Sequence, residues 1–298
     1  MKRAFNTQMV PLLAVFAAFS FIIMMFNLPL PGGTTGHAVG VGIATIVLGP
    51  WASILGISIA LIIQAVFFGD GGITTIGANC FNMAIIGSLA TYAIYRALAG
   101  RAPIASARRV IAAGVAGYAA INLAALAAAV EFGIQPLLYH DASGAPLYAP
   151  YPLHIAIPAM MIGHLTIAGL AEMVVSAGVV AYLQRSEPAL LKRTAPGAVE
   201  GSAEASGLRP LWFALAALLI LTPLGILATG SAWGESMPVP TPRGLLALSS
   251  FWTAPMPRYA PPFLKSPAFG YLLSAMTGTG VILLVVLIAG WMANKRSQ

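Results

Sequence analysis

Long apolar runs recur along the whole chain, separated by short polar segments. Seven of them lie near residues 9–29, 51–68, 77–98, 109–131, 155–183, 210–229 and 269–292. About 20 apolar residues in a helix span the roughly 30 Å hydrocarbon core of a bilayer, where a helix satisfies its own backbone hydrogen bonds. Only 8% of the 298 residues are charged, against about 25% in soluble domains. The sequence therefore predicts an all-α integral membrane protein and excludes a soluble enzyme.

The stretch 38–68 is also apolar but contains Gly49-Pro50 in its interior. Proline lacks a backbone N–H, and the residue before it is pushed away from helical geometry. We therefore predict a short crossing, 37–48, and a full crossing, 51–68. The chain then has about eight crossings. They form a six-helix body over residues 1–184, a flexible cytoplasmic linker at 185–209, and a two-helix module at 210–298 with an outer loop at 230–268.

The distribution of positive charge supports this division. With the N-terminus inside, twelve Lys and Arg residues fall on the cytoplasmic side and only Arg243, Arg258 and Lys265 fall outside. This is the asymmetry of the positive-inside rule, and a single crossing over 38–68 would place the Arg96–Arg109 cluster outside. The net charge of +7 is thus explained by topology and contact with membrane lipid, and we predict no nucleic-acid partner. The first apolar segment is too long for a signal peptide, so we expect it to remain as a span.

His37 is the first candidate for chemistry. It ends a Gly-rich outer loop within the sequence LPLPGGTTGHAVGVG, residues 28–42. Glycine allows close backbone approach, and neutral imidazole is the commonest protein ligand for transition metals. The alternative is a histidine that only caps the start of the short helix.

A second polar loop, GDGGITTIGANCFNMA at residues 69–84, faces the same side. Asp70, Asn79 and Asn82 could orient a histidine or close a lid over it. Alternatively, Asp70 is a solvated turn residue and the two asparagines form helix-packing hydrogen bonds. Cys80 is the only cysteine, so no internal disulfide or thiolate cluster can form, and we expect it to fill a small space in the core.

The 155–183 crossing carries further ionisable residues. From the helical rise, His164 lies roughly 15 Å and Glu172 roughly 27 Å deeper than His154, so one ion cannot touch all three. Ionisable residues in a bilayer are functional candidates, although His164 could be a neutral packing residue. We expect Glu172 to pair with a cytoplasmic Arg or to lie in a subunit contact. His140 and Asp141 are expected to be solvated.

Several enzyme motifs are missing from the sequence. It contains no GxxxxGK[ST] phosphate loop, no HExxH motif and no nucleophile elbow, so we expect neither ATP hydrolysis by this chain nor protease chemistry. We predict no catalytic residue and no resident cofactor. A transporter or a transport subunit remains.

At this point the motifs resemble a known family. GTTGH, LGPW, QAVFFGDGG, TIGAN and NMA follow one another over residues 34–84, and GHLTIAGLAE follows at 163–172. This order resembles the cobalt/nickel substrate-binding membrane subunits (S components) of energy-coupling-factor transporters, the CbiM/NikM type. The segments TPLGILATGSAWGE and YAPPFLKSPAFGYLLSA in 208–298 resemble the two-helix accessory module of these subunits.

The resemblance implies capture of Co²⁺ or Ni²⁺ outside the plasma membrane of a prokaryote. A membrane scaffold (T) subunit and cytoplasmic ATPase subunits would drive release inside. It implies that His37 is a metal ligand. From their place in the two polar loops, we expect Thr35, Asn79 and Asn82 to lie around this ligand. The family also uses an N-terminal Met-His, which this chain lacks because it begins Met1-Lys2; one further helix before Lys2 would bring such a terminus to the outer face.

Two functional surfaces and two alternative functions complete the expectations. Ala14 and Ala18 share a helix face and form a small-residue seam on which the scaffold could dock, unless they pack within this chain. The 230–268 loop is expected to hold the His37 loop in shape, or else to be a passive cap. The alternative functions are a vitamin-type substrate-binding subunit of the same transporter class and a non-transporting membrane scaffold.

Overall fold

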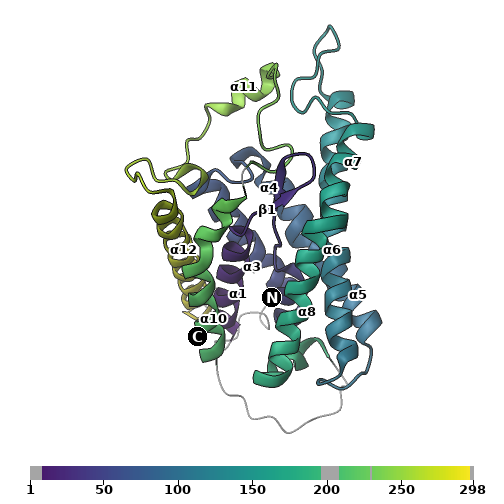
Figure 1. The fold of residues 1–298 in the computed structure, drawn as a ribbon, viewed down its shortest axis with the longest axis vertical. Coiled ribbons are helices and arrows are strands. Elements are labelled where there is room, and N and C mark those ends of the chain that lie inside the picture. The colour runs from purple at the N-terminus through teal and green to yellow at the C-terminus, as the bar shows by residue number, and fades with distance from the viewer. Residues whose placement is uncertain (1–8, 196–207, 229, 296–298) are drawn as a thin grey trace.

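Long helices running along one axis make up most of the molecule (Figure 1). The computed structural model describes residues 9–195, 208–228 and 230–295. The body begins with α1 (Met9–Met24), β1 (Leu28–Leu30), β2 (Thr34–Gly36), α2 (Val41–Leu48), α3 (Pro50–Ile63) and the π-helical turn η1 (Gln64–Phe68). It continues with η2 (Ile73–Thr75), α4 (Ile76–Asn79), the π-helical turn η3 (Cys80–Ile86), α5 (Gly87–Ala99) and α6 (Ala107–Leu138).

The rest of the chain adds one more helix to the body and then the C-terminal module. The last body segment comprises α7 (Leu153–Gly163), the π-helical turn η4 (His164–Ala168), α8 (Gly169–Ser186), α9 (Pro188–Leu191) and η5 (Lys192–Thr194). The module comprises α10 (Arg209–Leu221), η6 (Thr222–Leu227), α11 (Arg243–Ser249), η7 (Pro257–Tyr259) and α12 (Pro267–Lys295).

The helical membrane fold expected from the sequence is confirmed. Six helical segments of the described chain are long and apolar enough to cross a bilayer: 50–68, 73–99, 107–138, 153–186, 209–227 and 267–293. The shorter α1 and α2 complete the eight helical segments that the apolar runs predict. The loop between α6 and α7 and the segment around α11 lie at one end of the molecule, and the C-terminal end of α8 lies at the other (Figure 1).

The break between α2 and α3 falls at the predicted Gly49-Pro50. Gly49 adopts a φ of 81°, which favours glycine, and Pro50 occupies the first turn of α3. Proline is tolerated there because the first amides of a helix have no intrahelical partner. Thr194 holds the C-terminal end of α2, because its hydroxyl donates to the carbonyl oxygen of Ile46.

Three predicted boundaries differ from the structure. The first helix ends at Met24, because Pro29 and Pro31 follow and residues 28–30 pair with 34–36 as a hairpin. The helix expected to end at 131 continues to Leu138, supported by α7, which it approaches closely at Gly133. In the predicted linker, residues 188–194 are helical because Leu191 is fully buried; its residues 196–207 lie outside the described residues, as do the predicted cytoplasmic Lys2 and Arg3.

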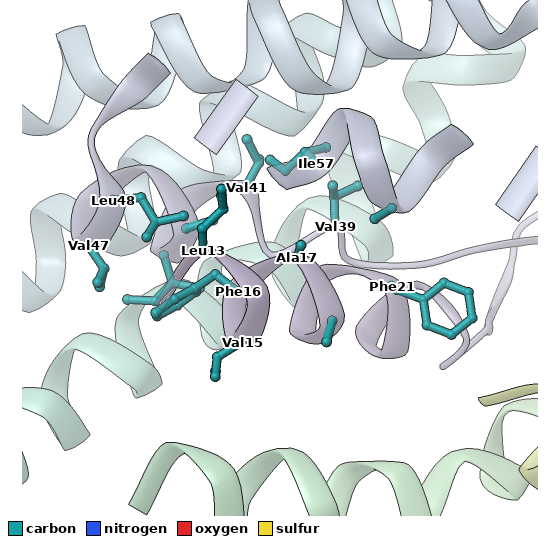
Figure 2. Packing of buried hydrophobic residues seen from close by; sticks show 14 of the residues in the cluster. Leu13, Val15, Phe16, Ala17, Phe21, Val39, Val41, Val47, Leu48 and Ile57 are labelled. Atoms are coloured by element: carbon teal, nitrogen blue, oxygen red, sulfur yellow. The ribbon is translucent and has the colours of Figure 1, made fainter. Parts of the chain in front are cut away.

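Helix α1 lies at the centre of the apolar core. Thirteen of its sixteen residues are buried, packed mainly against α12 and α3 and also against α10 and α2. Figure 2 shows Leu13 and Phe16 of α1 in one cluster with Val41 and Leu48 of α2 and Ile57 of α3. The segment between α1 and His37 therefore begins at a helix that is packed on several sides.

The C-terminal module contributes to this support. Helix α12 approaches α1 so closely that a Cβ added at Gly278 would lie 2.1 Å from the Phe21 ring, and one at Gly290 would lie 2.6 Å from the Val10 methyl groups. Small residues allow such close packing between helices in lipid, where the hydrophobic drive between helices is absent.

Replacing Gly278 by leucine should separate α12 from α1, because Phe21 already occupies the space. Overpacking of this kind costs typically about 1–3 kcal/mol, so we expect a clearly lower thermal unfolding temperature in lipid nanodiscs. Gly280→Leu is the matched control, since a Cβ at Gly280 meets no atom within 4 Å. Equal unfolding temperatures for the two variants would contradict this packing.

Candidate functional site

The His37 loop is a short hairpin at the outer end of the predicted topology. Strands β1 and β2 pair antiparallel, with Pro29 opposite Thr35. The turn between them uses Gly32 and Gly33, both with φ near 80–90°, where a residue with a Cβ would be strained. His37 follows β2 directly and is half-buried. Its Nδ1 lies 3.2 Å from the carbonyl oxygen of Ala38.

The surroundings of His37 favour a neutral imidazole. Burial lowers the pKa of His37, and the negative charge of Asp70 only partly opposes this effect. Burial disfavours the charged form because it removes the ring from water. A neutral imidazole keeps a lone pair on one ring nitrogen, which is the form that binds transition metals.

His164 is the second histidine at this site. The two imidazoles lie within electrostatic range of each other, and the Nδ1 of His164 lies 2.8 Å from the carbonyl oxygen of Met160. The hairpin reaches the helix because Leu30 fits beside Gly163, where a Cβ would be 2.8 Å from its methyl group. The spacing of residues along the helix predicted the depth of His164, but it could not predict that the β1–β2 hairpin packs against the helix near this residue.

Asp70 is held by one residue of the body and one of the C-terminal module. The amide Nε2 of Gln64 lies 3.2 Å from Asp70 Oδ2 and 3.0 Å from the Tyr259 hydroxyl. Tyr259 donates its hydroxyl hydrogen to Asp70. Burial and the Asp70 charge raise the pKa of Tyr259 well above its ordinary value, so the hydroxyl stays protonated and remains a donor. Asp70 therefore joins the module to the loop that follows η1.

The polar residues predicted to surround the ion make other hydrogen bonds. The Thr35 amide donates to the Ser231 carbonyl, which adds a strand-like segment of the module to the hairpin. Asn79 donates to the carbonyl of Gly71 and shapes its own loop. Asn82 donates to Glu131 of α6 at 2.7 Å. None of these hydrogen bonds involves the His37 ring.

Among the residues that the structure describes, Glu172 bonds to backbone amides and to no cytoplasmic arginine, so the expectation of an arginine pair is wrong. Its carboxylate is fully buried and accepts hydrogen bonds from the amides of Val39, Gly40 and Gly42. The start of α2 needs such an acceptor because the first amides of a helix are unsatisfied. The sequence could not show this, since the partners are backbone groups about 130 residues away.

Ala14 and Ala18 lie inside the molecule. Their side chains are 2% and 0% exposed, and α1 is packed against α12 and α10 as well as α2 and α3. In this structure the two alanines are therefore in intrachain packing, the alternative to a docking seam. A partner could reach them only if covering helices moved aside.

Three π-helical turns carry polar residues of this region, and no sequence pattern predicted them. The turns η1, η3 and η4 hold Gln64, Asn82 and His164, respectively. Such turns insert one residue into a helix and are frequent at functional sites. Glu131 and Tyr259 were also missed, because their roles depend on contacts between distant segments.

The remaining candidates are peripheral. His140 and His154 are exposed, and Asp141 is bound within its own loop. Hydrogen bonds from Ser143 and Ala145 lower the pKa of Asp141. Cys80 packs partly buried against the core, as expected.

The described residues supply only part of a metal site. Within the described ranges, no group of three or more His, Cys, Asp and Glu side chains is arranged to hold a metal ion. His37, with His164 beside it, can contribute imidazole nitrogen. An ion bound here would need donors from backbone groups or from another segment.

Comparisons with known proteins agree with the membrane fold and point to metal transport. Residues 1–190 match the family described as "Cobalt uptake substrate-specific transmembrane region". The "Fused nickel transport protein NikMN" of Rhodobacter capsulatus is 51% identical over 95% of this chain and 86% of that protein. The "Cobalt transport protein CbiM" of Geobacter sulfurreducens is 33% identical over 76% of this chain and 62% of that protein. A crystal structure titled as a transition metal transporter matches with a TM-score of 0.57 at 49% identity, covering 65% of this chain and 84% of that one.

Tyr259→Phe removes one hydroxyl from the junction between Asp70 and the module. Because hydrogen bonds to charged groups contribute about 1.5–3 kcal/mol, we expect a lower unfolding temperature and faster proteolysis in the loop around Asp70. Tyr139→Phe is the control, since that ring is half exposed. A Tyr259→Phe protein that melts and digests like the control would show that this junction is not needed.

Proposed function

The chain belongs to the family of cobalt uptake substrate-specific transmembrane regions, and from this premise we propose that it is the substrate-capture subunit of a Ni²⁺ or Co²⁺ uptake transporter. It captures the ion at the outer end of the molecule, at His37. The observation that carries this proposal is a half-buried imidazole at the end of a glycine-shaped hairpin. Nickel and cobalt bind well to imidazole nitrogen.

Nickel is the first ion to test. The relative that matches this chain through the module as well as the body is named a fused nickel transport protein, and one from Lactiplantibacillus plantarum that is 43% identical over 78% of this chain is named a probable fused nickel transport protein. The relative from Geobacter is named for cobalt. Similar nitrogen donors suit both ions. The preference for Ni²⁺ or Co²⁺ therefore depends on the coordination geometry that the complete set of donors would impose.

The remaining donors are part of the proposal. Since His37 and His164 do not form a complete ligand set, we infer that a nitrogen-bearing N-terminal segment of the Met-His type completes it. Its terminal amine, backbone nitrogen and imidazole would surround the ion together with His37. Titration of the chain with and without such an extension tests this point.

We further propose that the chain works with a scaffold subunit and cytoplasmic ATPases in a prokaryotic plasma membrane. The chain contains no phosphate loop, so the energy for ion release has to come from partners. A vitamin-type subunit would instead bind an organic ligand and neither ion. A non-transporting scaffold would copurify with partners but bind no ligand.

Replacing His37 by alanine should weaken Ni²⁺ and Co²⁺ binding at least tenfold, because it removes the principal imidazole donor. Isothermal titration of the full chain, tested with the Met-His extension also present, measures the effect. His140→Ala is the matched control, because His140 is exposed in a different outer loop. If His37→Ala binds like His140→Ala, His37 is not the ligand.

The outer segment of the module should assist ion loading by holding the hairpin. The Thr35–Ser231 and Asp70–Tyr259 hydrogen bonds support this role, because a loop that is already ordered loses less conformational entropy when it binds the ion. Replacing residues 231–262 by a Gly/Ser linker retains the packing of α12 on α1, which deletion of 208–298 would remove. We expect lower radioactive Ni²⁺ uptake for both variants in cells that supply the scaffold and ATPases. Unchanged uptake of the linker variant at equal protein level would make the segment a passive cap.

A further inference from the structure

Glu172 presents an unusual arrangement of a carboxylate inside a membrane protein. It is fully buried on α8, yet its described partners are neutral donors. Oε2 accepts from the amides of Val39 at 2.8 Å and Gly40 at 2.9 Å. Oε1 accepts from the Gly42 amide at 3.0 Å and from the Ser176 hydroxyl at 3.4 Å. Both oxygens are therefore used to hold one short piece of backbone.

This backbone has no local means of satisfying its amides. Gly40 precedes α2 in a left-handed conformation, and no side chain of the segment caps the helix. The first amides of a helix carry the positive end of its dipole, so a carboxylate is a favourable partner. A buried carboxylate with several amide donors is also itself satisfied, which it must be in a low-dielectric interior.

Close packing places Glu172 on this segment. A Cβ added at Gly42 would lie 2.1 Å from the Ser176 hydroxyl oxygen and 3.1 Å from the Cα of Gly117. Helices α2, α6 and α8 therefore meet at Gly42 and Gly117. Because Ser176 is one turn from Glu172 on α8, this contact fixes the height at which the carboxylate meets the amides.

The bond to Val39 leads directly to His37. The amide of Val39 and the carbonyl of Ala38 belong to the same planar peptide unit. Glu172 accepts from the nitrogen side of this unit, and the Nδ1 of His37 lies 3.2 Å from its oxygen side. A single rigid peptide thus separates the carboxylate from the imidazole.

We propose that Glu172 is a positioning residue for the ion site, acting on His37 through the Ala38–Val39 peptide. This inference rests on the proposed function of His37 as metal ligand. With the peptide held by Glu172, its carbonyl accepts the Nδ1–H of His37, which leaves the lone pair of Nε2 for the ion. Metal-binding histidines are commonly fixed in this way by an acceptor on their second nitrogen, and loss of such partners lowers metal affinity 10–100-fold.

The test uses the full chain in lipid nanodiscs with Ni²⁺ alone as the probe. Glu172→Gln keeps the size of the side chain but replaces one acceptor oxygen by an NH₂ group, so it cannot accept on both sides. Ser176→Ala is the matched control, because it removes one hydroxyl donor from the same carboxylate but keeps the Cβ that packs against Gly42 and Gly117. Ni²⁺ affinity and amide hydrogen exchange are measured for each protein.

We expect Glu172→Gln to bind Ni²⁺ 10–100-fold more weakly and to exchange faster only around residues 38–42. Ser176→Ala should stay within threefold of the unchanged protein in affinity. Equal affinity of Glu172→Gln and the unchanged protein would overturn the positioning role while leaving metal capture intact. Faster exchange throughout α3, α6 and α8 would overturn it as well, since the effect would then be general destabilisation.

A different result separates the inference from the proposed function. If the unchanged chain binds no Ni²⁺, with or without a Met-His extension, metal capture fails and the positioning role fails with it. If the unchanged chain binds and His37→Ala does not, but Glu172→Gln binds normally, only the role of Glu172 is wrong.

Discussion

Backbone amides and carbonyls that leave a helix inside a membrane protein need partners, and this requirement shapes the centre of the molecule. Helix α2 has only eight residues, so both of its ends lie within the protein. The amides of Val39 and Gly40 just before it and of Gly42 in its first turn meet the Glu172 carboxylate, and the Ile46 carbonyl in its last turn meets the Thr194 hydroxyl. Water is absent from the bilayer core, so without these two side chains a half-length crossing would leave costly unsatisfied groups. The loop that carries His37 can exist there because α8 and the segment after it provide the acceptor and the donor.

Glycine makes these contacts possible at several levels. Gly42 and Gly117 let α2 and α6 meet Ser176 of α8, and Gly278 lets α12 meet Phe21. The second contact explains why the C-terminal module is part of the same packed unit as α1, although a polar segment separates them in sequence. Close helix packing at glycines thus supports the hairpin, the helices beneath it and the module together.

The sequence predicted the parts of the structure that depend on neighbouring residues. Apolar length gave the eight helical segments, and Gly49-Pro50 gave the break before α3, because both signals act locally. Contacts between distant segments were not predictable in this way. The depth of Glu172 along its helix was available, but its partners are main-chain amides that have no sequence signature. No local pattern predicted the hydrogen bond between Tyr259 and Asp70. Ala14 and Ala18 form the same small-residue pattern whether they pack against a partner subunit or within this chain. His37 was found because glycine spacing marked its loop, whereas His164 joined it only through the fold of the hairpin.

The π-helical turns have a consequence for how related chains can differ in length. The turn η1 ends the crossing 50–68, whereas η3 and η4 each hold an extra residue within an otherwise continuous crossing. A one-residue deletion there would restore a regular α-helix, while the residues on one side of the turn would rotate by about 100° relative to those on the other. The deletion would leave each crossing apolar and nearly as long, yet it would turn Asn82 or His164 away from its present partners. Length changes of one residue at η3 or η4 are therefore tolerable for insertion into the bilayer and disruptive for the hydrogen bonds of Asn82 and His164.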